Sequence, residues 1–207
     1  MPSRRKLLSY AVVFVVVGIV IIIVWAMSSG FFKPVYDARQ IVMDEWEFST
    51  YLDATIYNRT LFGYPSLVFN VSSSVGSEAY MLTLDSAELP LKSVSLIRSF
   101  DSSCRIDWGW LGFGNNYMFF TWNGTRWIAN TDNGSGVPEV TIVSGYSPSS
   151  GWRKLSIEAT LTEVKYYLDD DLVATHVNKI PSGDFQFYGE LESTGTATEL
   201  YIAWHES

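Results

Sequence analysis

The stretch "GWRKLSIEATLTEVKYYLDDDLVATH", residues 151–176, alternates apolar and polar residues on both sides of three consecutive aspartates. An alternation with a period of two is typical of a β-strand that buries one face. Aspartate tolerates the positive φ of a tight hairpin, and three successive side chains point in different directions. We therefore predict a hairpin turn at residues 169–171, with a calcium site as the alternative.

The same period of two recurs from residue 44 to the end of the chain. In "EWEFSTYLDATIY", residues 45–57, Trp46, Phe48 and Leu52 fall on one face, which predicts a single half-buried antiparallel strand. No window beyond residue 28 sustains a helical period. Many short strands separated by turn residues predict an all-β, antiparallel sandwich of the jelly-roll type. Further strands are expected at residues 67–71, 79–84, 94–98, 105–110, 116–122, 126–130, 139–143, 152–160, 163–168, 172–177, 185–191 and 198–205.

The start of the chain is different in kind. Residues 7–27 contain no charged side chain and are long enough, at about 1.5 Å per residue, to cross a bilayer as a helix. Arg4, Arg5 and Lys6 precede this stretch, so the positive-inside rule leaves the N-terminus in the cytoplasm. We predict a cytoplasmic tail (1–6), a transmembrane signal anchor (7–27), a linker or edge segment (28–43) and an extracellular β-sandwich (44–207). A signal peptide cleaved at Ser28 is the alternative.

The net charge argues against one class of binding partner, and the cysteine content excludes one kind of cross-link. All 22 acidic residues but only 11 of the 14 basic residues follow residue 28, so this region has a net charge of about −11. Such a surface argues against binding nucleic acid. The only cysteine, Cys104, excludes a disulfide within the chain, and we expect it to be a buried strand residue.

The last third of the chain resembles the back half of concanavalin A-like lectin/glucanase domains, which include the laminin-G-like modules. In these jelly rolls a tryptophan opens a strand, an aromatic-rich strand follows, and an Asp-Gly turn leads into an apolar return strand. Here Trp152 opens, Tyr166 lies in the aromatic strand, and Asp169 and Asp170 stand where Asp-Gly usually turns. The closing "ELYIAWHES" is similar to the final strand of these domains. The resemblance is clearest over residues 150–207.

Glucanases of this fold often carry Glu-x-Asp-x-x-Glu on one strand, which provides the nucleophile and the acid/base. This string is absent, and the nearest candidates are the isolated pairs Glu45/Glu47 and Glu190/Glu192, which we expect on the solvent side of strands. Two histidines, His176 and His205, and one cysteine offer no zinc-binding spacing. We therefore expect no catalysis, no metal and no cofactor, with calcium as the one alternative.

Tryptophans are the candidate ligand-binding residues. Trp108 and Trp110 share a strand face, and Trp122 and Trp127 flank the turn "NGTR". Exposed indoles could stack on sugar rings, although sandwich cores also bury tryptophan. Four Asn-x-Ser/Thr sequons are expected to be N-glycosylated on the outside of the cell: Asn58, Asn70, Asn123 and Asn133.

These observations predict a single-pass protein of the cell membrane, with the bulk of the chain extracellular. We expect a non-catalytic domain that binds carbohydrate or an envelope protein. The first alternative is a structural subunit of a surface filament or layer that self-assembles through sheet edges. The second is a glycan hydrolase, which the missing motif disfavours.

Overall fold

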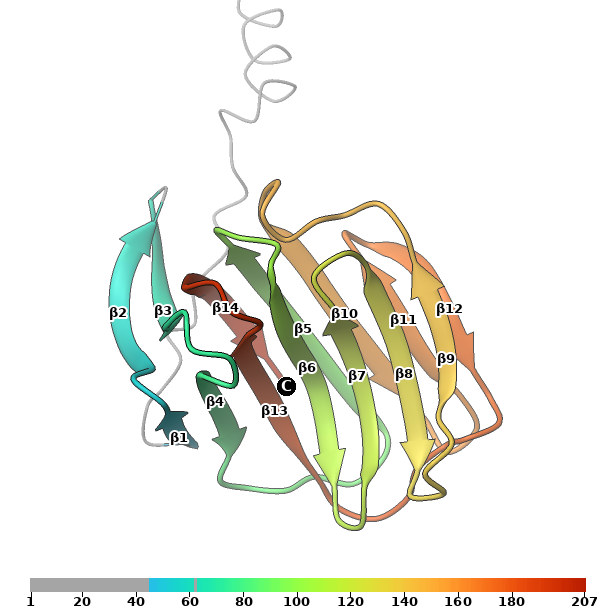
Figure 1. The fold of residues 1–207 in the computed structure, drawn as a ribbon. Coiled ribbons are helices and arrows are strands. Elements are labelled where there is room, and N and C mark those ends of the chain that lie inside the picture. The colour runs from blue at the N-terminus through green and yellow to red at the C-terminus, as the bar shows by residue number, and fades with distance from the viewer. Residues whose placement is uncertain (1–44, 62) are drawn as a thin grey trace, which may run out of the picture. The chain divides into compact units, whose positions relative to one another are not determined.

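A computed structural model describes residues 45–61 and 63–207 of the chain (Figure 1). These residues form fourteen β-strands in two packed sheets. The strands are β1 (Trp46–Tyr51), β2 (Thr55–Leu61), β3 (Tyr64–Val71), β4 (Glu78–Thr83), β5 (Leu91–Ser99), β6 (Cys104–Gly112), β7 (Asn116–Trp122), β8 (Trp127–Asn133), β9 (Glu139–Val143), β10 (Arg153–Ala159), β11 (Val164–Leu168), β12 (Asp171–His176), β13 (Phe185–Ser193) and β14 (Thr198–Glu206).

Each sheet contains seven strands. The first sheet has the order β1-β4-β13-β6-β7-β8-β9, and the second has the order β12-β11-β10-β5-β14-β3-β2. All strand pairs are antiparallel. Strands distant in sequence, such as β13 and β6, lie side by side, and the two sheets form front and back layers in Figure 1. The predicted all-β antiparallel sandwich is confirmed.

One predicted strand is wrong. Residues 45–57 were expected to form a single strand, but the chain turns at Leu52 and Asp53, which have φ values of 49° and 62°. Before this turn β1 pairs with β4 in the first sheet, and after it β2 pairs with β3 in the second. The alternation continues through the turn because both halves bury one face, so the pattern alone cannot detect the change of sheet.

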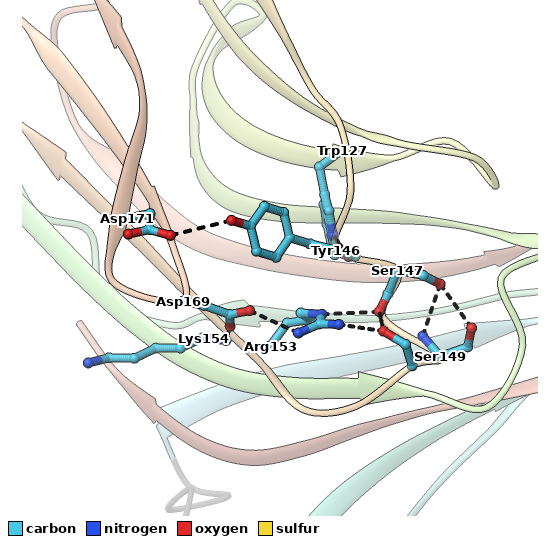
Figure 2. Close-up of polar contacts among 9 residues, drawn as sticks. Trp127, Tyr146, Ser147, Ser149, Arg153, Lys154, Asp169 and Asp171 are labelled. Atoms are coloured by element: carbon cyan, nitrogen blue, oxygen red, sulfur yellow. Dashed lines mark hydrogen bonds and ion pairs between the residues drawn. The ribbon is translucent and has the colours of Figure 1, made fainter.

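The predicted hairpin turn is confirmed, but it consists of two residues rather than three, because Asp171 is already the first residue of β12. Asp169 and Asp170 have φ values of 53° and 72°, and Leu168 pairs with Asp171 across the turn. Figure 2 shows how Asp169 and Asp171 are held. The Asp169 carboxylate accepts hydrogen bonds from the Lys154 backbone N–H and the Arg153 guanidinium, both at 2.9 Å, while Asp171 accepts one from the Tyr146 hydroxyl at 3.3 Å. These carboxylates therefore have different partners and do not converge.

Alternating side chains from both sheets fill the core. The two sheets are also joined by a polar contact, because the Trp108 indole N–H donates to the Ser95 hydroxyl at 2.7 Å, and Ser95 hydrogen-bonds His205 Nδ1 at 2.8 Å. Cys104 is fully buried on β6, as predicted, and burial raises the pKa of its thiol to about 11.

The predicted tail, signal anchor and linker, residues 1–43, lie outside the described residues. Within the described part of the chain, no helix is long and apolar enough to cross a membrane. No group of three or more potential metal ligands occurs in that same part.

Candidate functional site

The four tryptophans predicted as a ligand platform lie in the core. Trp108, Trp110, Trp122 and Trp127 are between 1% and 3% exposed. They occupy the inward positions of β6, β7 and β8, where a large ring gains most from leaving water. The prediction that these residues bind a ligand from solvent is therefore wrong.

The outward positions of the first sheet hold a different set of side chains. In β13, Phe187 and Leu191 are fully buried, while Tyr188, Glu190 and Glu192 at the alternate positions are partly exposed. Successive side chains of a strand point to opposite faces, so the latter three face away from the second sheet. This outer face of the first sheet is the candidate site.

Charged residues of three neighbouring strands meet on this face. Glu190 lies directly opposite Asp107 of β6, and Glu192 lies opposite Arg105. On the other side of β13, Glu192 lies opposite Glu78 of β4. Directly opposed residues have Cβ atoms about 4.5–5.5 Å apart. We call Glu78, Asp107, Glu190 and Glu192 the carboxylate row, and Arg105 is the basic residue paired with it.

Asp107 is fixed within this row by two polar side chains. The Arg105 guanidinium lies 2.7 Å from one carboxylate oxygen, and the Thr121 hydroxyl donates to the other at 2.5 Å. Thr121 in turn accepts a hydrogen bond from the Asn130 amide at 3.0 Å. Asp107 is only 4% exposed, whereas the Arg105 side chain is 52% exposed, so water partly screens this ion pair. The result is a negative charge held in one position beside Glu190.

Glu190 is a titratable group of this face with a strongly perturbed environment. Burial raises the pKa of its carboxyl to about 7, and the nearby negative charges of Asp107 and Glu78 act in the same direction. The Tyr188 hydroxyl hydrogen-bonds to Glu190 and lowers the pKa in part, as does Arg105. At neutral pH this carboxyl is therefore protonated in a large fraction of molecules, which is the state a general acid requires.

Aromatic rings form a second row on the same face. The ring centroids of Tyr80 and Tyr188 are 5.8 Å apart, those of Tyr188 and Phe119 are 5.8 Å apart, and Phe119 stacks on Tyr117 at 5.2 Å. Tyr188 and Phe119 belong to strands separated by β6, and both lie opposite Gly109. The two rings therefore meet across the intervening strand. We call these four residues the aromatic row.

Sequence reasoning missed both rows. Glu190 and Glu192 were expected to be ordinary solvent-facing acids, but Glu190 is half-buried among other carboxylates. The motif Glu-x-Asp-x-x-Glu was sought on one strand, whereas β6 reads Arg105-x-Asp107-x-x-Trp110 and retains only the aspartate. Here the carboxylates come from adjacent strands that are far apart in sequence. The available signal was the set of outward aromatic and acidic positions in β7 and β13.

The remaining predicted site residues are dispersed. Asn58, Asn123 and Asn133 are exposed, whereas Asn70 is half-buried and its amide donates to Thr55 at 3.2 Å. Their N-glycosylation stays a prediction.

The two histidines are buried apart from one another. His176 Nδ1 and Nε2 hydrogen-bond Thr131 and Thr141, and burial lowers its pKa. His205 is also buried, which lowers its pKa to about 3, so it is neutral.

Comparisons with known proteins find similar folds among solved structures only. The chain matches no known family profile and no curated protein sequence. Among solved structures, it is similar to the β-glucanase of Bacillus licheniformis (TM-score 0.64, 12% identity, 81% of this chain and 93% of that one). It is also similar to the laminarinase catalytic domain of Thermotoga maritima (0.63, 14%, 80% and 92%) and to the Crh5 transglycosylase (0.65, 12%, 79% and 78%).

The resemblance to the concanavalin A-like superfamily is thus confirmed at the level of the fold. The same comparisons contradict our expectation of a non-catalytic binding domain that is not an enzyme, because these structural neighbours are glycan hydrolases and a transglycosylase. The expectation rested on the missing single-strand motif, and that criterion ignores carboxylates brought together by strand pairing.

Proposed function

We propose that this chain cleaves or transfers glycosidic bonds of a neutral polysaccharide on the outer face of the first sheet. The observation that carries the proposal is the half-buried Glu190 carboxyl, with its pKa raised to about 7, directly opposite the charged Asp107. Glycosidases use two carboxyl groups in different protonation states, one as an acid and the other as an anion. The glucanase and transglycosylase neighbours of the fold support this class of reaction.

The aromatic row supplies the binding surface in this proposal. Sugar rings have apolar C–H faces that pack against aromatic rings, and the partly exposed Tyr80, Tyr188, Phe119 and Tyr117 form a continuous aromatic strip beside the carboxylates. The strip crosses the strands from β4 to β7, so it suits an extended chain of several sugar units.

The chemistry follows from the two protonation states. Glu190 donates its proton to the glycosidic oxygen as the bond from that oxygen to the anomeric carbon breaks. The positive charge that develops at this carbon faces the Asp107 carboxylate, which Arg105 and Thr121 hold in place. A water molecule or a sugar hydroxyl then adds to the carbon, and the Glu190 carboxylate takes its proton. Water gives hydrolysis, and a sugar hydroxyl gives transfer.

Activity assays on the full chain test the proposal. The chain is incubated with β-1,3-glucan and with mixed β-1,3-1,4-glucan, and new reducing ends and transfer products are measured. Glu190→Gln should lower the rate by about 10²–10⁴, the usual contribution of a general acid. The control Glu47→Gln removes an exposed carboxylate from β1, at the edge of the same sheet, and should leave the rate unchanged. Equal rates for Glu190→Gln and the unmodified chain would refute the assignment.

For the location of the protein, we propose that residues 7–27 anchor the sandwich to the membrane with its sequons outside the cell. The uncharged length of this stretch, the basic cluster before it and the net charge of about −11 beyond residue 28 support this topology. Intact-mass analysis of the mature protein tests it. A mature chain that begins at Ser29 would rule out the anchor.

A further inference from the structure

The outer face of the second sheet contains a groove that lies on the opposite side of the sandwich from the carboxylate row. Its volume is about 260 Å³, and side chains of β5, β10, β11 and the β11–β12 turn line it. The local sequence explains its shape. Ser156 of β10 lies directly opposite Val94 of β5, and both side chains are short. Longer side chains stand on either side of them, so the centre of this face is hollow.

Ion pairs close both ends of the groove. At one end Lys92 Nζ lies 2.7 Å from a Glu158 carboxylate oxygen, and at the other Lys154 Nζ lies 2.6 Å from Asp170. Figure 2 shows the Lys154 side chain extending away from Arg153 and Tyr146. The lining thus contains two cations and two anions and carries no net charge. A charged ligand gains no net attraction here, so the lining favours a neutral one.

The polar groups of the groove also match one class of neutral ligand. The two ammonium groups donate hydrogen bonds, the two carboxylates accept them, and the Ser156 hydroxyl does both. Tyr167, which lies opposite Ser156 and donates to Glu158 at 3.3 Å, supplies an aromatic ring beside these groups, and Val94 supplies an aliphatic surface. A sugar ring carries adjacent hydroxyls and has an apolar face, so its binding requires this combination of donors, acceptors and apolar surface.

We propose that this groove is a second carbohydrate site, which binds one or two units of a neutral glycan without cleaving it. Its volume is slightly below the roughly 300 Å³ at which drug-sized sites begin, which suits one or two sugar units. The two sites lie on opposite faces of the sandwich. A glycan held in the groove therefore keeps the protein on the polysaccharide while the carboxylate row remains free.

Methyl NMR of the full chain in detergent micelles tests the groove separately from the proposed activity. The chain carries Glu190→Gln to prevent turnover and is titrated with neutral tetrasaccharides of β-linked glucose, galactose, mannose and N-acetylglucosamine. The methyl signals of Val94 report on the groove, and those of Leu82 report on the outer face of the first sheet. We expect at least one sugar to shift the Val94 signals in a saturable manner at millimolar concentration.

Two variants and one control assign the response. Ser156→Phe fills the groove and should abolish the Val94 shift while the Leu82 signals stay unchanged. Lys154→Met keeps the aliphatic stem but removes a donor, and should weaken binding several-fold. Thr175→Phe adds the same ring to an exposed position of β12, outside the groove, and should have no effect.

Two outcomes would overturn the proposal. The Val94 signals could fail to respond to any of the four sugars at about 10 mM, or they could respond equally in Ser156→Phe. Absence of glucanase activity would not affect the result, because the titration measures binding alone.

Discussion

Replacing Glu190 with glutamine should make the protein less active and more stable at the same time, in a manner that depends on pH. The pKa of this carboxyl rises from a reference value of 4.5 to about 7 in the folded chain. The folded state then binds the proton more tightly than the unfolded state, so the free energy of unfolding falls as pH rises from about 4.5 to 7. At about 1.4 kcal/mol per pKa unit, the free energy of unfolding falls by at most about 3 kcal/mol. This value is an upper limit, because partial solvation of the carboxyl makes the fall smaller.

Glutamine has nearly the same shape as glutamate and no charge to bury, so Glu190→Gln should abolish this pH-dependent fall in the free energy of unfolding. Near pH 4 the variant and the unmodified chain should have similar melting temperatures. At pH 8 the variant should melt at most roughly 6–12 °C higher, since 1 kcal/mol corresponds to about 2–4 °C in a domain of this size. Thermal unfolding between pH 4 and pH 8 measures both values.

Glu192→Gln is the matched control for this experiment. It removes a carboxylate from the same face of β13, and the Arg105 guanidinium lies 3.7 Å from that carboxylate. The control should gain no stability at pH 8, because it loses an attraction to Arg105. A melting-temperature difference for Glu190→Gln that stays constant between pH 4 and pH 8 would refute the burial argument and remove the main support for a proton donor at this position.

Three further predictions test other parts of the structure. Asp170→Gly should change the melting temperature by no more than a few degrees in either direction, since glycine adopts positive φ without strain and the exposed ion pair with Lys154 contributes little stability. A large fall in the melting temperature would contradict the turn geometry. Gly189→Ala should destabilise the fold by about 1–3 kcal/mol, because its Cβ would lie 2.4 Å from the Trp108 ring, whereas Gly151→Ala has open space and should be nearly neutral in the same denaturant titration. If Glu190 serves first as acid and then as base, the new bond should form on the face that the leaving group occupied, and NMR of early products should show retained anomeric configuration; inversion would exclude this role.

The sequence by itself determined the fold class and most of its elements. The period-two alternation indicated the strands to within a few residues, as for Asn116–Trp122 and Glu139–Val143, because one buried face imposes that period wherever a strand lies in a sandwich. The aspartate turn was also predictable, since φ tolerance is a property of the residue type. The change of sheet at Leu52 was not, because the alternation of apolar residues is the same in both sheets.

Only the tertiary structure decided what each outward or inward position does. The pattern could not distinguish a core tryptophan that is only 1% exposed from one that stacks on a ligand, because both occupy alternate positions of a strand. Nor could it bring Glu190 next to Asp107, since 82 intervening residues and six other strands separate these two residues along the chain, and only the pairing of β13 with β6 in the first sheet makes them neighbours. The raised pKa of Glu190 exists because that pairing buries one carboxyl beside others, and no local stretch of sequence contains this information.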